Sequence, residues 1–161
     1  MITDYIDKII NGNCVDVMKQ LPDNSIDLVV TSPPYDNLRT YKGYTFPFED
    51  IVAQLYRIIK EGGVVVWVVS DATVNGSETC TSFRQALTFV AKGFKLHDTM
   101  IFQKTNPVPQ IYRKRYTNVF EYMFVFSKGN VATHNPIKVP CLHAGLELKG
   151  TTYKNYSKGE Q

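Results

Sequence analysis

The sequence lacks the features that would place this protein in a membrane, in a disulfide-bonded class or at a metal. No apolar run approaches the roughly 18 residues of a membrane-spanning helix. We also expect no signal peptide, because the first residues have no basic start followed by a long apolar core. The three cysteines form no Cys-x-x-Cys pair, and the three histidines share no metal-ligand spacing. These absences indicate a soluble protein of a reducing cytoplasm, without a metal site or a disulfide framework.

An excess of charge of one sign is missing as well. The 161 residues hold 18 Lys and Arg against 15 Asp and Glu, a net charge of +3. Any contact with nucleic acid must therefore come from a local basic cluster rather than from the whole surface. With 43% hydrophobic and 20% charged residues, the composition is that of one ordinary globular domain.

The hydrophobic pattern alternates between helix and strand periods along the chain. It predicts a helix over 14–21, a buried strand over 27–31, a helix from 48 that ends at Gly62 and Gly63, a strand over 64–70 covered on both faces, a helix around 83–91 that ends at Gly93, and strands over 95–104 and 118–129. This order is typical of an α/β domain, and we expect a mostly parallel sheet with an antiparallel edge strand. From about residue 128 the periodicity fails, which predicts a loop-rich tail over 129–161.

The first predicted strand ends in Thr-Ser-Pro-Pro-Tyr, which begins at Thr31. Two consecutive prolines cannot extend a central strand, because each fixes φ and removes a backbone donor. The Ser32 hydroxyl and the Pro33 carbonyl can accept hydrogen bonds from both N–H groups of an amine on a planar ring. Pro34 helps to hold that carbonyl rigidly, and Tyr35 can stack on the ring. We interpret these residues as a cradle for the amine of a nucleobase; a plain strand-terminating turn is the alternative.

Such a cradle would make a weak nucleophile reactive. The lone pair of an exocyclic amine is conjugated into the base, so the nitrogen attacks poorly. Two acceptors on its N–H groups pull the nitrogen toward tetrahedral geometry and free the lone pair. No strong general base is needed, because the proton can leave after methyl transfer.

Two segments resemble a known family. NGNCVDVMKQLPDNSIDLVVTSPPY, followed by FEDIVAQLYRIIKEGGVVVWVVSD, is similar to the amino-methylating DNA methyltransferases in their permuted order, in which the catalytic motif precedes the cofactor motif. The similarity runs from about Ile9 to Lys128. It implies an incomplete Rossmann-like methyltransferase fold, S-adenosyl-L-methionine as methyl donor, and double-stranded DNA with a flipped-out base as substrate.

The first position of the catalytic motif bears on the choice of base. In the family it is commonly Asp in adenine N6 enzymes and Ser in those that modify cytosine N4. Ser32 therefore favours cytosine N4, and adenine N6 is the alternative. A related class that methylates side-chain amides of proteins usually has Asn at this position.

The resemblance also implies which residues lie near the donor. Asn13 stands where the family often has Asp, near the donor's adenosine. Asn equally suits an N-cap of the following helix, and both interpretations stay open. Thr31 and Ser32 are assigned to the donor as well. Asp71, at the end of the second predicted strand, either lines the pocket or caps a turn.

Basic residues in two loops are candidates for contact with DNA phosphates. They are interleaved with tyrosines, and the second group lies between two predicted strands, where no core face demands it. A solvated loop is the alternative for each group. The candidates are Arg39, Lys42, Arg113, Lys114 and Arg115.

The family's donor-binding turn, typically Phe-x-Gly-x-Gly, has no counterpart, since no Gly-x-Gly occurs in the sequence. We therefore expect residues 1–128 to be the catalytic part of a methyltransferase domain and 129–161 the start of a missing target-recognition region. A catalytically inactive remnant with a DNA-binding or structural role is the alternative function. Because an incomplete sheet exposes edges and apolar faces, we predict association with a second copy or with a complementary fragment.

Overall fold

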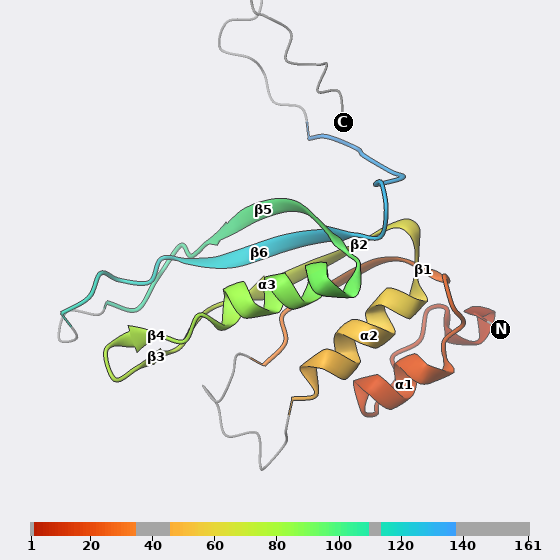
Figure 1. Ribbon diagram of the computed structural model, residues 1–161, viewed down its shortest axis with the longest axis horizontal. Helices are drawn as coiled ribbons and strands as arrows, with labels where there is room; N and C mark the ends of the chain where they lie inside the picture. Colours follow the sequence, from red (N-terminus) through yellow and green to blue (C-terminus); the bar gives the residue numbers. More distant parts are fainter. Residues whose placement is uncertain (1, 35–45, 110–113, 138–161) are drawn as a thin grey trace, which may run out of the picture.

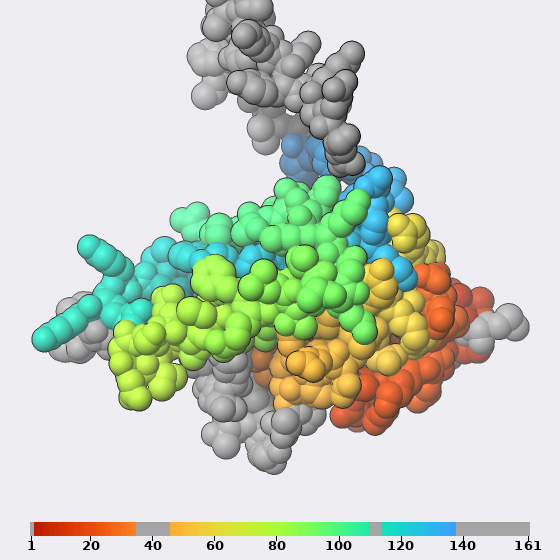
Figure 2. All heavy atoms as spheres, viewed as in Figure 1, coloured from red at the N-terminus to blue at the C-terminus, as the bar shows by residue number. Residues whose placement is uncertain are grey.

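The computed structural model describes residues 2–34, 46–109 and 114–137 of the chain. These residues form a four-stranded sheet with the α-helices on one side of it (Figure 1). The elements are a 3-10 helix η1 (Ile2–Tyr5), α1 (Cys14–Gln20), β1 (Ile26–Thr31), α2 (Phe48–Ile58), β2 (Ile59–Val69), β3 (Thr73–Val74), β4 (Ser77–Glu78), α3 (Thr81–Lys92), β5 (Lys95–Gln103) and β6 (Phe120–Ser127). Helices and strands follow the predicted order, except that the β3–β4 hairpin, which the pattern did not predict, lies between β2 and α3. α2 and α3 lie side by side, as the space-filling view shows (Figure 2).

The strands of the main sheet lie in the order β1-β2-β6-β5. β1 and β2 are parallel, whereas β6 is antiparallel to both of its neighbours, so β1, β2 and β5 share one direction. The predicted α/β fold with one antiparallel strand is confirmed, but this strand is internal rather than at an edge. The apolar sequence of β6 explains its place, because Phe124 and Phe126 are 4% and 0% exposed.

The pair Gly62–Gly63, predicted to end α2, lies inside β2 instead, since helix and strand follow each other without a loop. The glycines permit close backbone contacts. A Cβ on Gly63 would lie 3.0 Å from the Asp27 carbonyl, and one on Gly62 would lie 2.7 Å from the Cβ of Ala132. Gly62 also has a φ of +79°, which suits glycine alone. The prediction is wrong because the local pattern does not distinguish a helix end from a point of close approach.

The core lies between the sheet and the helices α2 and α3. Trp67 of β2 is only 1% exposed. Phe89 of α3 stacks on Phe126 with 4.2 Å between ring centroids and meets Trp67 edge-on at 5.1 Å. α3 ends at Gly93, as predicted, with a φ of +113°. This aromatic cluster fixes α3 across β2 and β6.

The opposite face of the sheet is apolar, and the described residues leave much of it uncovered. Leu28 and Val30 of β1 are 56% and 65% exposed, and Met100 and Phe102 of β5 are 49% and 52% exposed. β1 is a strand where the pattern predicts one, but it is not buried. The prediction that β2 is covered on both faces also fails for its half-buried outward valines. An apolar sequence pattern indicates that a sheet face is suited to burial, but it does not show that another part of the chain buries it.

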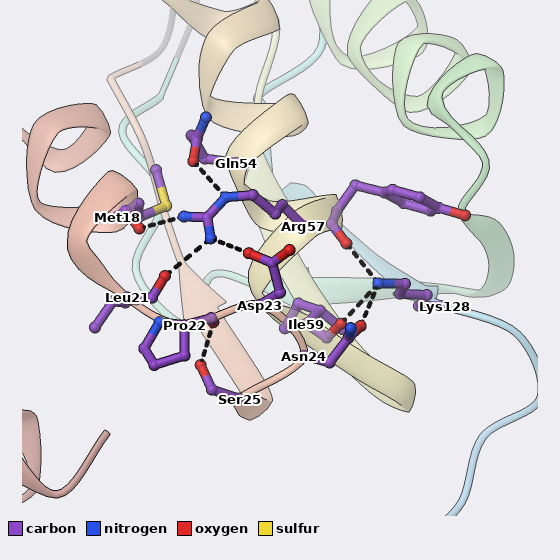
Figure 3. Close-up of polar contacts among 11 residues, drawn as sticks. Met18, Leu21, Pro22, Asp23, Asn24, Ser25, Gln54, Arg57, Ile59 and Lys128 are labelled. Carbon is purple, nitrogen blue, oxygen red and sulfur yellow. Dashed lines mark hydrogen bonds and ion pairs between the residues drawn. The ribbon is translucent and has the colours of Figure 1, made fainter. Parts of the chain in front are cut away.

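Two cations from distant parts of the chain hold the turn between α1 and β1 (Figure 3). Arg57 of α2 donates to the carbonyls of Met18 at 2.6 Å and Leu21 at 2.9 Å. Its guanidinium is also paired with the Asp23 carboxylate. These bonds supply partners to carbonyls at the end of α1, where the Met18 carbonyl also accepts the backbone N–H of Leu21 at 3.0 Å. Arg57 thereby joins α2 to the end of α1 and to the turn that follows it.

Lys128, just after β6, holds the same turn from another side (Figure 3). Its ammonium donates to the Asn24 side chain at 2.7 Å and to the carbonyls of Tyr56 and Ile59 at 2.8 and 3.0 Å. The ammonium also lies 4.8 Å from the centroid of the Tyr56 ring. The end of α2, the approach to β1 and the end of β6 therefore meet at one point, which fixes β1 at its amino end.

Candidate active site at the carboxyl ends of the strands

Several chain segments meet at one edge of the main sheet. β1 ends at Thr31, which is paired with Trp67 near the end of the parallel strand β2. β5 ends at the same edge, where Gln103 is paired with Phe120, the first residue of β6. Ligands of open α/β sheets bind beyond such carboxyl ends. The segments at this edge are residues 32–34, 70–72, 104 and 118–119.

The Thr-Ser-Pro-Pro bend lies at this edge and at the surface. Ser32 is exposed, and Thr31, Pro33 and Pro34 are half-buried. The bend is therefore accessible to a ligand and not packed into the core, as the cradle interpretation requires. Tyr35 lies outside the described residues. The catalytic roles assigned to these residues stay predictions.

Asn13 caps the first turn of α1. Its side-chain Oδ1 accepts a hydrogen bond from the backbone N–H of Val15 at 2.9 Å. The side chain is exposed. The N-cap interpretation is thus what the structure shows, and the contact of Asn13 with the donor stays a prediction.

Asp71 follows β2 at the same edge and holds the start of α3. Its carboxylate accepts a hydrogen bond from the backbone N–H of Ser82 at 3.0 Å and a second one from the Ser82 hydroxyl. The Thr79 hydroxyl donates to it at 3.4 Å. Of the two interpretations of Asp71, a pocket-lining residue or a cap, the structure shows the cap. The capped element is the start of α3 and not a local turn.

A polar network that the sequence pattern did not single out joins β5, β6 and the end of β2. The Asn118 amide donates to the buried Ser70 hydroxyl at 3.5 Å and accepts from the Lys104 ammonium at 3.5 Å. Lys104 is also paired with Glu121 at 3.2 Å. The available signal was the placement of Lys104 and Asn118 directly at strand ends. The network ties the long connection between β5 and β6 to the candidate site's edge.

Arg115 of this connection is tied to the β3–β4 hairpin. Its guanidinium donates to the Gly76 carbonyl at 2.8 Å and is paired with Glu78 at 3.4 Å. Lys114 beside it is exposed. The sequence-predicted basic cluster thus has one member held by the protein itself. The other candidates, Arg39, Lys42 and Arg113, lie outside the described residues.

The part of the chain that the structure describes contains neither a cluster of metal ligands nor a membrane-spanning helix. Within residues 2–34, 46–109 and 114–137, no group of His, Cys, Asp and Glu side chains could hold a metal ion. No helix in these same ranges is long and apolar enough to cross a membrane. Cys14 and Cys80 are exposed free thiols, and Cys141 lies outside the described residues.

The fold is that of the Rossmann-like methyltransferases. It is similar to the solved structure of PvuII DNA methyltransferase (cytosine-N4-specific), with a TM-score of 0.62 at 21% identity over 74% of this chain and 48% of that one. It is also similar to the M1.HpyAVI–SAM complex, with a TM-score of 0.59 at 19% identity over 87% and 68% of the two chains. These likenesses confirm the predicted fold class.

The chain belongs to the N6/N4 methyltransferase family, whose model is described as DNA methylase and matches residues 26–158. This confirms the resemblance drawn from the Thr-Ser-Pro-Pro-Tyr motif and its neighbours. The match continues past residue 128, and the domain boundary placed there stays a prediction.

Two curated relatives show how much of a methyltransferase the chain covers. The orphan methyltransferase M.BamHII of Bacillus amyloliquefaciens is 58% identical over 118 residues, which are 73% of this chain and 44% of that protein. The type II methyltransferase M.BglII of Bacillus subtilis is 28% identical over 166 residues, 97% of this chain and 44% of that protein. The chain thus spans less than half the length of either relative.

Proposed function

We propose that the chain is the catalytic part of a DNA methyltransferase. It transfers a methyl group from S-adenosyl-L-methionine to the exocyclic amine of a flipped base, with cytosine N4 favoured over adenine N6. The observation that carries this proposal is the place of exposed Ser32 and half-buried Pro33, directly after the carboxyl end of β1. Membership of the DNA methylase family supports the reaction class. Ser at the first motif position supports cytosine.

The bend acts by accepting hydrogen bonds from the amine. The Ser32 hydroxyl and the Pro33 carbonyl each take one N–H, which draws the nitrogen toward tetrahedral geometry and frees its lone pair. Pro33 and Pro34 have restricted φ angles, so the carbonyl keeps its direction. Tyr35 stacks on the base and holds its plane. The nitrogen would take up the methyl group as the bond between that carbon and the sulfur of the donor breaks, and the electron pair of that bond would stay on the sulfur as a neutral thioether. The positively charged nitrogen then loses a proton to water, so no strong general base is needed.

One wall of the donor site is formed by Asn13, Thr31 and Ser32 in this proposal. When bound, the donor supplies a methyl group on a positively charged sulfur, which makes that carbon electrophilic. Thr31 and Ser32 lie at the edge where such sheets bind ligands. Because Oδ1 of Asn13 is engaged with Val15, its amide N–H groups are the ones directed to a ligand. These residues fit one wall only, since the Gly-x-Gly turn is not among the 161 residues.

Double-stranded DNA is the proposed partner, and phosphate contacts are assigned to the two basic loops. A local cluster is what a net charge of +3 allows. Lys114 is exposed, and Arg115 stands beside it at the same end of the molecule. A DNA substrate is also compatible with the cytoplasmic location predicted from the sequence. The proposed contacts are Arg39, Lys42, Arg113, Lys114 and Arg115.

A catalytically inactive remnant is the second candidate function. The observation that favours it is the lack of a Gly-x-Gly turn in the sequence, because this turn lets backbone approach the methionine part of the donor. Such a remnant would keep the fold and its DNA contacts without transferring methyl groups.

Transfer of a labelled methyl group to duplex DNA, followed by nucleoside analysis, tests the proposal. The chain is incubated with labelled S-adenosyl-L-methionine and duplex DNA. N4-methylcytosine is the expected product, and N6-methyladenine would favour the alternative base. Unlabelled DNA would favour the remnant.

A further inference from the structure

We propose that the tip of the β3–β4 hairpin, residues 73–77, enters the major groove of duplex DNA next to the base that is methylated. The tip supplies hydrogen bonds and apolar contacts to base edges, in addition to the phosphate contacts assigned to the basic loops. This inference rests on the proposed function, because duplex DNA is the partner proposed there. It identifies a second DNA-contacting element, which the sequence pattern did not single out.

The hairpin is too short to keep its shape without support. β3 and β4 make two pairs of residues, and an isolated two-stranded hairpin is marginally stable at best in water. Asn75 and Gly76 connect the strands with left-handed φ angles of +49° and +82°, as a two-residue type I′ turn requires. The turn sets the shape of the tip, and the remaining support must come from other parts of the chain.

Contacts at both ends of the hairpin provide this support. At its base the Thr79 N–H donates to the Ala72 carbonyl at 2.9 Å, and the Ala72 N–H donates to the Thr79 hydroxyl at 3.2 Å. At its turn the Arg115 guanidinium donates to the Gly76 carbonyl at 2.8 Å and is paired with Glu78 at 3.4 Å. These contacts fix the direction of the hairpin. An element held in this way binds a partner with little loss of conformational freedom.

One side of the hairpin faces the rest of the chain, and the other side is exposed. Residues opposite each other in a hairpin point to the same side, and successive residues alternate. Because Glu78 faces Arg115, Val74 and Ser77 lie on the other side of the ribbon. Val74 is 56% exposed. No side chain of residues 73–77 is charged, so the tip offers methyl groups, hydroxyls and one amide, which are groups that contact base edges in a groove.

The hairpin begins at the edge of the sheet that carries the candidate active site. Residues 70–72 alone separate the end of β2 from β3, and Thr31, which is paired with β2 near that end, leads to Ser32. The extended chain from Ala72 to Asn75 spans about 10 Å. Figure 1 shows the hairpin at the end of the molecule to which the described parts of the β5–β6 connection also extend. A duplex whose base is held at Ser32 therefore lies within reach of the tip.

The charges next to the hairpin fit a duplex. Lys114 is exposed, and the side chain of Arg115, which holds the hairpin, is 30% exposed. Phosphates can therefore meet these cations while the uncharged tip lies between the two strands of the DNA. The major groove is about 12 Å wide and admits a two-stranded ribbon, whereas the minor groove is about 6 Å wide. In the major groove the Asn75 amide can bond to adenine, and the methyl groups of Val74 can contact that of thymine.

Turn geometry is the competing explanation for Asn75, because type I′ turns favour Asn followed by Gly. Asn75→Gly separates the two explanations. Glycine also adopts left-handed φ angles, so the substitution keeps the turn and removes the side chain. Turn geometry does not account for Val74, which precedes the turn and is exposed. Val74→Ser removes its two methyl groups at a position where the core does not depend on them.

Fluorescence anisotropy with short duplexes of randomised sequence tests the contact. Asn75→Gly should weaken binding about fivefold or more, and Val74→Ser about threefold. The slope of log affinity against log salt should stay unchanged in both variants, because neither loses a phosphate contact. Ile6→Ser is the matched control and should bind like the unchanged chain. Ile6 is 57% exposed near the amino terminus, which Figure 1 shows at the opposite end of the molecule from the hairpin.

Duplexes with uracil in place of thymine test the choice of groove. They lack the thymine methyl groups, which lie in the major groove. The unchanged chain should bind them about twofold more weakly than thymine duplexes, whereas Val74→Ser should bind both alike. Equal midpoints of urea unfolding for the unchanged chain and all variants show that the differences do not come from folding.

The outcomes separate the inference from the proposed function. The hairpin contact is overturned if Asn75→Gly and Val74→Ser bind DNA as tightly as Ile6→Ser, or if their losses come with a lower salt slope. Equal weakening of the unchanged chain and Val74→Ser by uracil overturns the contact of Val74 with thymine. Weaker binding by the hairpin variants without methyl transfer by the unchanged chain supports the contact and removes the proposed activity. Methyl transfer that these variants leave unchanged, together with unchanged binding, keeps the activity and removes the contact.

Discussion

The indole N–H of Trp67 donates a hydrogen bond to the side-chain carbonyl of Gln85 at 2.8 Å. Trp67 lies in β2 directly beside Thr31, the last residue of β1, and Gln85 lies in α3. The two side chains are 1% and 6% exposed. This buried bond therefore connects α3 to the strand pair that carries the candidate site.

Gln85→Met should lower the free energy of unfolding by about 1–3 kcal/mol. The substitution keeps the length of the side chain but leaves the buried indole N–H without an acceptor. Urea unfolding measures the effect. Thr88→Ala in the same helix is the control, because its exposed hydroxyl bonds only a carbonyl of its own helix. Equal stabilities of these two variants would contradict the assigned role of the buried bond.

Arg57→Ala should lower the free energy of unfolding by about 1.5–3 kcal/mol, because it removes charge-assisted bonds to two backbone carbonyls and a carboxylate. Lys60→Ala is the comparison, since it breaks an exposed ion pair with Asp27 at 2.8 Å. An exposed pair of this kind contributes about 0.5 kcal/mol or less. A loss from Lys60→Ala as large as that from Arg57→Ala would refute the view that Arg57 holds the turn before β1.

Gly62→Ala should destabilise the protein more than Gly76→Ala. Both glycines have left-handed φ angles, +79° and +82°, so backbone strain of about 1–2 kcal/mol applies to each. Only at Gly62 would the new Cβ meet other atoms, the Cβ of Ala132 at 2.7 Å and the backbone N of Ala132 and O of Asn130 at 3.1 Å each. The double variant Gly62→Ala, Ala132→Gly removes the shortest of these contacts and should recover part of the difference in thermal unfolding. If it does not, the close approach of β2 to the segment after β6 is not what requires glycine.

Glu78→Gln should strengthen binding of duplex DNA a few-fold at low salt. The change removes a negative charge beside Arg115 and Lys114 and ends the ion pair of Arg115, while the bond of its guanidinium to the Gly76 carbonyl stays, so the local charge that a phosphate meets becomes more positive. Lys114→Ala should weaken binding and reduce the slope of log affinity against log salt by about one. Fluorescence anisotropy over a salt series measures both. Weaker binding by Glu78→Gln would mean that the pair positions the loop and that Arg115 does not contact DNA.

Ser32→Ala should reduce methyl transfer about a hundredfold or more while the free energy of unfolding stays within about 0.5 kcal/mol. The side chain is exposed at the edge of the sheet, so it contributes little packing, but it supplies one of two acceptors for the amine. Single-turnover rates of methyl transfer and a parallel urea titration give the two readouts. Unchanged transfer would show that the hydroxyl is not part of the cradle.

The helices and strands were predictable where local signals are strong. α3 shows this for its end, because Gly93 stops the helix as predicted. Its buried face was not predictable from the apolar spacing, since Phe83, Leu87 and Val90 are exposed and Ser82 and Gln85 are buried. The site of the Ser32–Pro33 bend was also predictable, since a diproline after an apolar run marks the end of a strand. The existence and the end of a helix and the end of a strand depend on neighbouring residues in the sequence, which is why a local pattern predicts them.

Features that depend on distant residues were not predictable from the pattern. The place of β6 between β2 and β5 follows from pairing across the sheet. The glycine pair in β2 is required by the close approach of chain segments that are distant in sequence. The side chain of Arg115 bonds to Glu78, which lies 37 positions away in the sequence. The carboxylate of Asp71 likewise bonds to the start of α3, which begins only after an intervening hairpin. Charge and polarity identify such residues as candidates, but only the fold decides their partners.

Nucleoside analysis of duplex DNA after transfer of a labelled methyl group is the most direct measurement of the central claim, that the bend after β1 presents an amine for methylation. We expect the label in N4-methylcytosine and its loss with Ser32→Ala. Label that appears elsewhere on DNA, or label that persists undiminished in Ser32→Ala, would contradict it.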